Sequence, residues 1–299
     1  MKKLINRAIF SFERRGFFNI LPDELYLKIM YWASLGKKLD LKDPKAFNEK
    51  LQWLKLYNRD PEYTKMVDKF EAKKYVADII GEEYIIPTLG VWDNADDVDF
   101  AALPDKFVIK CTHNSGKGMY ICKDKSQMDE TAVREGLRAG LRQNYYKRGR
   151  EWPYKNVKPR IIAEQYMEDE KTAELRDYKF MCFDGEVKSL FVCSDRFSKD
   201  SLHVTFFDRD WNHLPFERQY PLKKDGIDKP QNLDLMIKLA EKLSADIPFL
   251  RVDLYEINGK IYFGELTFFP GGGNEAFTPE EWDYKFGSYI KLPNKRKEG

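Results

Sequence analysis

The chain has 299 residues, of which 42% are hydrophobic and 33% charged, and its formal net charge is +2. This is the composition of a soluble globular protein with about two or three subdomains, and the small net charge excludes a chain-wide attraction to nucleic acid. No apolar run is long enough to cross a bilayer. The histidines lack zinc-ligand spacing, and the four cysteines (Cys111, Cys122, Cys182 and Cys193) form no C-x-x-C pair, which favours buried, reduced thiols in a cytoplasmic protein.

Residues 1–18 have an amphipathic pattern. One helical face collects the apolar residues Leu4, Ile5, Ala8, Ile9 and Phe12; the basic residues elsewhere are Lys2, Lys3, Arg7, Arg14 and Arg15. Charge interrupts the apolar part and no small-residue cleavage site follows, so the segment is not a signal peptide. It suits either a helix docked on its own domain or peripheral contact with the inner face of a membrane. Both interpretations stay open.

The chain up to about residue 80 is predicted to be helical. A helix is expected from Pro22-Asp23 to about Ser34, and a second starts at Asp43-Pro44. The third runs from Pro61 to Gly81, where glycine ends it. Read by itself, the stretch around Asp68-Lys69 in this third helix is a solvated helix start of mixed charge.

Strands dominate the rest of the chain. Strand patterns occur at 84–87, 106–111, 119–122, 160–166, 176–183, 187–195 and 202–208, and helical patterns at 126–149 and 232–244. The turn Asp184-Gly185 joins two of these strands as a hairpin. Mostly antiparallel strands with intervening helices indicate an α+β fold.

A glycine-containing loop separates the strands 106–111 and 119–122. Lys110 ends the first strand, and Ser115, Gly116, Lys117 and Gly118 lead into the second. Glycine lets backbone N–H groups approach phosphate oxygens, and the two lysines would add positive charge there. The loop is not a Walker A loop, because no G-K-[ST] sequence opens a helix. A plain hairpin loop is the alternative.

The most informative stretch is 249–273, which has the pattern of a β-hairpin. Asn258-Gly259 is a strong turn signal, with Asp253 five residues before it and Glu265 six residues after it. Pairing about this turn would bring the two acids roughly opposite each other. A divalent cation would relieve their repulsion, and Mg²⁺ carrying a nucleotide is the best candidate. The alternatives are a solvated sheet face, or one acid paired with Arg251.

In chain order, these pieces resemble the motifs of the ATP-grasp superfamily of carboxylate–amine ligases. The motifs are Asp68-Lys69, Lys110 with its glycine loop, the hinge acid Glu164, Arg251-x-Asp253, and Glu265-x-Thr267-x-x-Pro270-Gly271. The stretches PKAFNEKLQWLKLYNRDPEYTKMVDKFEAKKYV, GEEYIIPTLGVWDN, LPDKFVIKCTHNSG and GELTFFPGGG look like the narrower TupA-like branch. That branch is associated with bacterial capsule and cell-wall polysaccharide loci, and many members carry a glycosyltransferase label.

The resemblance implies an ATP-grasp fold, in which two α+β subdomains clamp ATP between antiparallel sheets. We expect a helical N-terminal region over 1–104, a lid subdomain with the glycine loop over 105–165, and a C-terminal subdomain with the metal site over 166–299.

The resemblance also implies roles for single residues. The residues expected to contact ATP are Lys69, Lys110, Ser115, Gly116, Lys117, Gly118, Glu164, Gln165, Tyr166, Met167, Asp177 and Lys179. Mg²⁺ ligation falls to Asp253, Glu265 and Thr267; the family commonly has Asn where this chain has Thr267, and the threonine side chain is shorter. The expected catalytic residues are Arg251, Lys110, Lys117 and Arg196.

The implied cofactors are ATP and Mg²⁺, and the implied reaction is amide formation. A substrate carboxylate would attack the γ-phosphate of ATP to give an acyl phosphate, from which an amine displaces phosphate. The expected acceptor is a uronic-acid-containing capsular or cell-wall polysaccharide or its precursor, joined to an amino acid or amine. Arg218, Trp282 and other residues between 209 and 284 suit a sugar carboxylate, or else core packing. A capsule-pathway glycosyltransferase is the alternative function.

Overall fold

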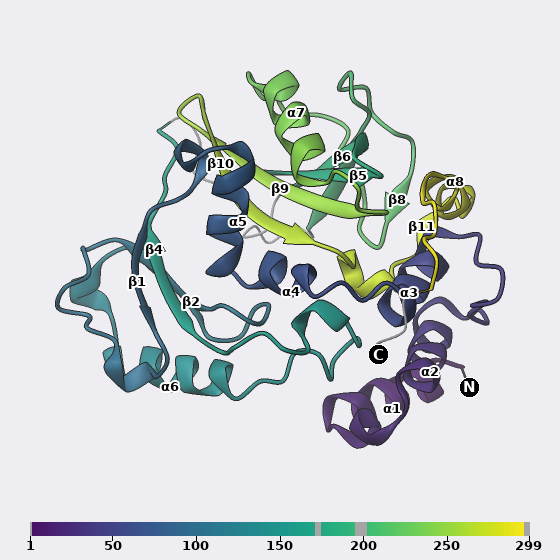
Figure 1. The fold of residues 1–299 in the computed structure, drawn as a ribbon, viewed down its shortest axis with the longest axis horizontal. Helices are drawn as coiled ribbons and strands as arrows, with labels where there is room; N and C mark the ends of the chain where they lie inside the picture. Colours follow the sequence, from purple (N-terminus) through teal and green to yellow (C-terminus); the bar gives the residue numbers. More distant parts are fainter. Residues whose placement is uncertain (1, 171–174, 195–201, 296–299) are drawn as a thin grey trace.

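The computed structural model describes residues 2–170, 175–194 and 202–295. They form two large antiparallel sheets and one small two-stranded sheet, with helices around and between them, which confirms the α+β class (Figure 1). No helix in these ranges is long and apolar enough to cross a membrane. The predicted subdomain boundaries at 104/105 and 165/166 stay predictions.

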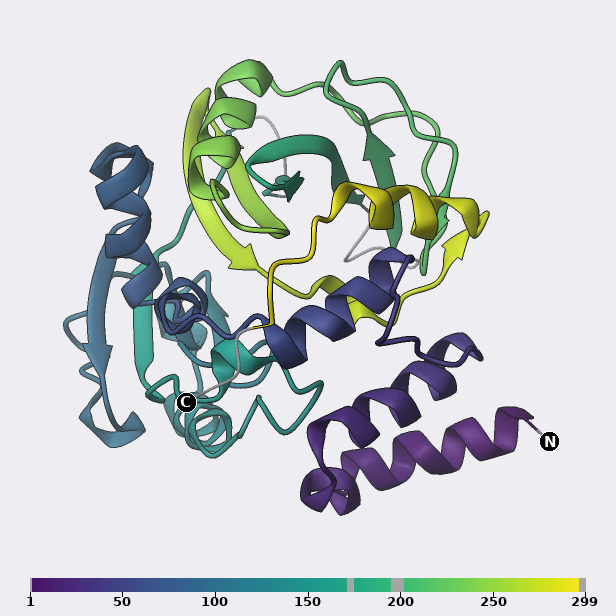
Figure 2. The same ribbon diagram turned by 45° about the vertical axis from the view of Figure 1, so that its right-hand side comes forward.

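Two helices at the N-terminus lie side by side at the edge of the molecule (Figure 2). They are α1 (Lys2–Arg14) and α2 (Asp23–Leu35). The predicted start of α2 is confirmed: Pro22 precedes it, and Asp23 and Glu24 place negative charge at its positive N-terminal end. Gly36, with φ 72°, ends it in the left-handed conformation. The next helix, α3 (Phe47–Tyr57), packs against α8 (Glu281–Tyr289) from the far end of the chain.

The predicted third helix is wrong as a single element. It is divided into α4 (Glu62–Val67) and α5 (Glu71–Ile80). At the break, Asp68 is extended, and its Oδ1 accepts the N–H of Phe70 at 2.9 Å. The N–H of Lys69 donates to the carbonyl of Thr112 at 3.1 Å. Because these bonds replace helical ones, tertiary contact overrides the helical periodicity.

The first sheet has the strand order β1-β4-β2-β3. Its strands are β1 (Thr88–Trp92), β2 (Phe107–Cys111), β3 (Met119–Cys122) and β4 (Ile161–Gln165), and α6 (Glu130–Leu141) covers it. The strand expected at 84–87 is wrong, because residues 82–84 form a 3-10 turn and pairing begins at Thr88. The helix expected over 126–149 is shorter, and Asp129 caps its start by accepting the N–H of Ala132.

The second sheet has the order β10-β9-β5-β6-β7. Its strands are β5 (Asp177–Phe183), β6 (Glu186–Ser194), β7 (His203–Phe207), β9 (Leu250–Ile257) and β10 (Lys260–Thr267); α7 (Leu233–Leu243) contacts three of them. A small pair, β8 (Glu217–Arg218) and β11 (Phe277–Thr278), lies beside it. The main hydrophobic core joins this sheet to α2, α3 and α8.

The hairpin of β9 and β10 brings its two acids together as predicted. Asn258 and Gly259 both have positive φ (51° and 75°), as the tight turn requires. Asp253 pairs directly with Glu265, although the two lie at unequal distances from the turn. A bulge between Phe263 and Glu265 absorbs the extra residue, Gly264.

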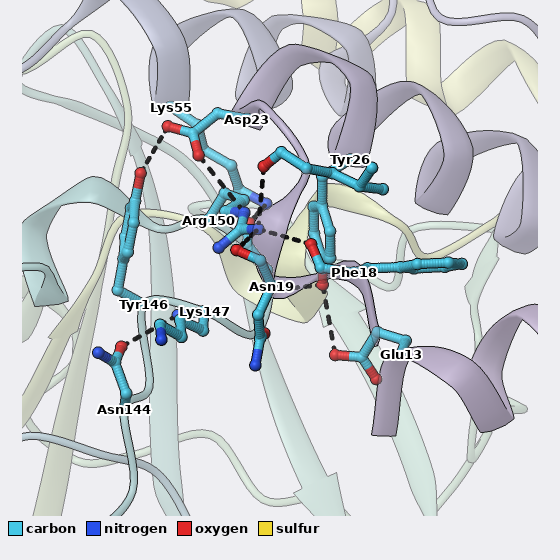
Figure 3. A network of polar contacts seen from close by, with 12 residues as sticks. Glu13, Phe18, Asn19, Asp23, Tyr26, Lys55, Asn144, Tyr146, Lys147 and Arg150 are labelled. Atoms are coloured by element: carbon cyan, nitrogen blue, oxygen red, sulfur yellow. Dashed lines mark hydrogen bonds and ion pairs between the residues drawn. The ribbon is translucent and has the colours of Figure 1, made fainter. Parts of the chain in front are cut away.

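Arg150 ties the N-terminal helices to the segment after α6 (Figure 3). Its buried guanidinium donates to the carbonyl of Phe18 at 2.9 Å and lies 3.4 Å from the carboxylate of Asp23. It also lies 4.6 Å above the ring of Tyr26. Tyr146, from the same segment as Arg150, donates its hydroxyl to Asp23 at 2.5 Å. These contacts hold α1 and α2 against the segment 144–150.

Candidate functional site

A cleft lies where residues of α4, α5 and β10 face the first sheet. Its lining combines apolar side chains with a cluster of charged ones: Met66, Val67, Lys69, Ala72, Lys73, Ile85, Ile86, Lys110, Tyr154, Glu164, Phe263, Gly264, Glu265 and Leu266. An apolar wall with a few convergent charges is typical of a small-molecule site.

Lys69 reaches the cleft because of the break between α4 and α5. Asp68 anchors that break through an ion pair with Arg160, at 2.7 Å. The ammonium group of Lys69 donates to the carbonyl of Asn114 at 2.5 Å. Burial lowers the pKa of Lys69, although Glu265 opposes this effect. The lysine therefore lies between the start of the glycine loop and the acidic hairpin.

Lys110 and Glu164 face the cleft from neighbouring strands of the first sheet. Glu164 is buried and pairs with Lys110 through one oxygen and with Lys73 through the other, at 2.6 Å for Lys73. Burial alone would raise the pKa of Glu164, but the two ammonium groups hold it below its ordinary value. The carboxylate thus fixes two lysines at one end of the cleft.

The hairpin supplies the other charged wall. Arg251 forms a two-point contact with Asp253, at 2.6 and 2.8 Å, and reaches Glu265 at 2.6 Å. Thr267 donates its hydroxyl to the same Glu265 oxygen at 2.9 Å. Burial opposes ionisation of Glu265, but Arg251, Lys179 and Lys69 together lower its pKa to about 2. The pairing with Arg251 is the alternative that the sequence left open.

Lys179 lies beside this hairpin because β5 pairs with β9, which places it opposite Asp253. Its ammonium group bridges the carboxylates of Asp253 and Asp177, and the Asp177 distance is 2.5 Å. All three side chains are buried. The predicted residues Asp177 and Lys179 therefore lie next to the predicted metal ligands.

The donor chemistry of the hairpin fits Mg²⁺. Asp253 and Glu265 offer hard carboxylate oxygens from directly paired positions, and Thr267 adds a hydroxyl. Within the described ranges, no group of three His, Cys, Asp or Glu side chains could hold a metal by itself. Mg²⁺ in proteins is commonly held by one or two carboxylates plus substrate phosphates.

The glycine loop has an anchored half and an exposed half. His113 and Asn114 are buried, and Asn114 donates its amide to the carbonyl of Gly140 at 3.1 Å. Ser115, Gly116 and Lys117 are exposed and lie outside the cleft lining. Gly116 has φ 87°, and a side chain there would meet open space.

Gly118 is the confined glycine of this loop. Its φ is 68°, and a Cβ there would lie 2.6 Å from the sulfur of Cys111. The tip of the loop can therefore change conformation, while packing holds its two ends in place.

The hinge residues continue from β4 beyond Glu164. Gln165 donates its backbone N–H to the carbonyl of Pro87 at 3.0 Å, so that donor already has a partner. Tyr166 lies under the ammonium group of Lys106, which is 5.7 Å from the ring centre. Gln165, Tyr166 and Met167 lie outside the cleft lining.

Other sequence hypotheses have different outcomes. Arg196 lies outside the described residues. The suggestion that Arg218 and Trp282 contact a sugar is wrong: Arg218 is buried against the rings of Phe47 and Phe277, and Trp282 stacks on the ring of Phe216. They belong to the core, the alternative that was open.

Two residues of the site were missed. Lys73 follows Lys69 by four residues, so the single helix predicted over this stretch would have placed both on one face, a signal that the sequence did contain. Glu151 is buried near Arg251 and Glu265, and burial raises its pKa to about 7 in spite of Lys55 and Arg251. No sequence signal identifies Glu151, because only the tertiary fold buries it.

Comparison with known proteins gives a family match and similarities to solved structures. A family model described as TupA-like ATPgrasp matches residues 49–291. No curated protein matches the sequence significantly. Among solved structures, D-alanine–D-alanine ligase from Helicobacter pylori is similar at 14% identity and a TM-score of 0.46, over 83% of this chain and 68% of that one.

Two further solved structures are similar over a smaller share of their length. They are the ATP-bound D-alanine–D-alanine ligase from Bacillus anthracis (14% identity, TM-score 0.40, 75% of this chain and 57% of that one) and the ATP-grasp ligase PsnB with its minimal precursor (10%, 0.40, 70% and 54%). This chain therefore spans little more than half the length of these two ligases.

Proposed function

Because the chain belongs to the TupA-like ATP-grasp family, we propose that it is an ATP-dependent carboxylate–amine ligase that forms an amide through an acyl phosphate. The observation that carries this proposal is the cleft, in which Lys69 and Lys110 face the hairpin acid Glu265. Positive side chains opposite a pair of carboxylates suit a magnesium-bound nucleotide triphosphate. We propose a cytoplasmic location for this ligase, because ATP is available there.

In the first step, an oxygen of the acceptor carboxylate attacks the γ-phosphorus and the bond to ADP breaks. Phosphoryl transfer needs positioning and neutralisation of charge more than covalent help from the protein. Lys69 and Lys110 would hold the phosphates, and Asp253, Glu265 and Thr267 would hold Mg²⁺. When bound, the cation supplies Lewis-acid stabilisation of the phosphate oxygens.

In the second step, the amine nitrogen attacks the acyl carbon, phosphate leaves, and the amine releases a proton. Arg251 already makes a two-point contact with a carboxylate, so its guanidinium has the geometry to stabilise the oxyanion of this step. Acyl phosphates hydrolyse in water, and exclusion of water would require the exposed tip of the glycine loop, with Lys117, to close over the cleft.

We also propose that the acceptor is a uronic-acid-containing capsular or cell-wall polysaccharide, or its precursor. Support for this finer assignment comes from the family resemblance alone. Mass spectrometry of the native surface polysaccharide, with and without this protein, tests it through the loss of an amide-linked group. An unchanged polysaccharide would contradict the assignment and leave the ligase chemistry to be judged separately.

The ligase chemistry is tested by release of ADP and phosphate that depends on an added carboxylate and amine. Asp253→Asn and Glu265→Gln should each lower turnover by about 100-fold or more. The exposed Asp246→Asn is the matched control and should keep wild-type turnover. Nucleotide release that continues unchanged in both site variants would contradict the proposed site.

The glycosyltransferase alternative predicts release of UDP from a nucleotide sugar. The chain contains two D-x-D stretches, beginning at Asp97 and Asp208. In both, a carboxylate accepts bonds from its own turn: Asp99 from the N–H groups of Ala101 and Ala102, and Asp208 from the N–H of Asn212. These acids are engaged locally, which favours the ligase, and UDP release would overturn it.

A further inference from the structure

The helix α1 presents its apolar side to solvent. Leu4, Ile5 and Phe12 expose 69%, 43% and 46% of their surface. The inward positions are shared by the polar residues Asn6 and Glu13 and by the partly buried Ile9 and Phe10. Asn6 donates its amide to the carbonyl of Ala33 on α2 at 2.7 Å, and Glu13 accepts the hydroxyl of Tyr26 at 3.3 Å. A helix that only docks on its own domain would not also expose a second group of apolar side chains.

The apolar surface continues into the turn after α1. Phe17 is 60% exposed and Ile20 is 89% exposed. The rings of Phe12 and Phe17 meet edge to face at 5.5 Å between centroids. We call Leu4, Ile5, Phe12, Phe17 and Ile20 the α1 apolar surface. Exposed apolar side chains gathered on one helix and the turn that follows it mark an interaction site, whereas single ones are ordinary.

Basic side chains border this surface. Arg7 and Arg14 line an open groove on one flank of α1, together with Arg148 from the segment after α6. Arg15 is exposed as well. The acid of the groove, Glu13, is engaged by Tyr26 and lies 3.9 Å from Arg148. The flank therefore offers an excess of positive charge beside the apolar side chains.

We propose that the α1 apolar surface docks peripherally on a bilayer that contains anionic lipids. Its apolar side chains would enter the boundary between headgroups and acyl chains, and the arginines of the flank would contact lipid phosphates. Charge favours this occupant over a second copy of the chain, because self-association through this surface would bring the same arginines together. This inference is independent of the proposed ligase activity.

The surface is preformed, which favours binding. Arg150 donates to the carbonyls of Phe18, Asn19 and Leu21, which fixes the turn that carries Phe17 and Ile20 (Figure 3). Side chains held in place before binding lose less conformational freedom on docking. The same arginine directly precedes Glu151, which is buried near Arg251 and Glu265.

Sedimentation of the full chain with vesicles tests the proposal. The protein should bind vesicles of phosphatidylcholine with phosphatidylglycerol, bind pure phosphatidylcholine more weakly, and dissociate as salt rises. Leu4→Ser combined with Phe12→Ser and Ile20→Ser should lower binding by about tenfold or more, and Arg7→Ser with Arg14→Ser should remove the preference for anionic lipid. Leu235→Ser, a 41% exposed leucine on α7, is the matched control and should bind as the wild type does.

Each result bears on the proposal. All substituted side chains are exposed, so circular dichroism should show native folding in every variant. No binding to anionic vesicles would overturn the proposal. Vesicle binding that is retained in the triple variant would also overturn the proposal. A concentration-dependent dimer that the triple variant abolishes, without vesicle binding, would assign the surface to a second copy of the chain instead.

Discussion

Glu151 is the carboxyl group of the site with the most unusual environment. It is 7% exposed and lies near Lys55, Arg251 and Glu265. Burial raises its pKa to about 7, and attraction from Lys55 and Arg251 only partly opposes this. A carboxyl group with a pKa near neutrality can exchange a proton under ordinary conditions, which is a property of many catalytic groups.

The stability of the protein should therefore depend on Glu151 between about pH 5 and 7. Its folded pKa lies above its ordinary value, so the folded state holds the proton more tightly. The stabilisation is complete at low pH and is lost as pH rises through 7. Relative to Glu151→Gln, the wild type should lose thermal stability across this range. Melting curves at a series of pH values measure this, with the exposed Glu135→Gln as the control. Parallel curves for wild type and Glu151→Gln would contradict the assignment.

Substitution of Thr267 tests the metal site through the loss of a single hydroxyl group. Its donation to Glu265 orients a carboxylate that would bind Mg²⁺. Thr267→Val keeps the shape and removes the hydroxyl, so affinity for ATP in the presence of Mg²⁺ should fall by about tenfold or more. Calorimetric titration measures it. Thr267→Asn restores an oxygen donor and should bind at least as tightly as the wild type. Equal loss in both variants would indicate that only the packing at this position matters.

At this scale, the sequence predicts four charged residues that line the cleft, namely Lys69, Lys110, Glu164 and Glu265. Spacing about Asn258-Gly259 is enough to place Asp253 opposite Glu265, because strand pairing is a local rule. The sequence leaves open whether a metal ion or Arg251 neutralises the two acids, since both would bind the same carboxylate oxygens. Glu151 cannot be found, because its burial depends on segments distant in the chain.

At the scale of elements, the departures from prediction occur where tertiary contacts replace local ones. Helical periodicity runs unbroken through residues 61–81, yet the chain extends at Asp68 because Thr112 and Arg160 offer it better partners. The break directs Lys69 into the cleft. The strands and hairpins of the second sheet, by contrast, follow their sequence patterns within one or two residues.

The bulge at Gly264 should be intolerant of a side chain. A Cβ there would lie 3.0 Å from both the carbonyl oxygen of Asp253 and the ring of Tyr255. Gly264→Ala should lower the free energy of unfolding by about 1–3 kcal/mol, as overpacking does. Gly136→Ala is the control: it meets open space within α6 and should stabilise by about 0.5–1 kcal/mol. Chemical denaturation measures both. Similar effects of the two substitutions would exclude a special role for the bulge.

At the scale of the whole molecule, Arg150 determines whether the N-terminal helices stay attached. It is 3% exposed and joins α2, the turn after α1, and the segment after α6. Arg150→Met removes every polar contact but keeps much of the volume. We expect a loss of about 1–3 kcal/mol in the free energy of unfolding, because buried backbone carbonyls lose their donor while Asp23 keeps Arg59 and Tyr146 as partners.

Protease sensitivity within residues 1–36 should rise in the same variant, as limited proteolysis with mass spectrometry would detect. Arg148→Met, whose side chain is 53% exposed, should change neither quantity. Cleavage that begins in the second sheet instead would show that Arg150 supports the molecule in another way.

The ion pairs of the cleft have a consequence for how a nucleotide arrives. Lys73 and Lys110 share the carboxylate of Glu164. Lys179 and Arg251 are paired with Asp177, Asp253 and Glu265, so four carboxylates balance these four cations. Little positive potential therefore extends into solvent beyond the cleft. The association rate of ATP should change only weakly with ionic strength, in contrast to electrostatically steered ligands. Entry of the nucleotide is then an exchange of partners, in which phosphate oxygens take over cations that the protein's own carboxylates held before.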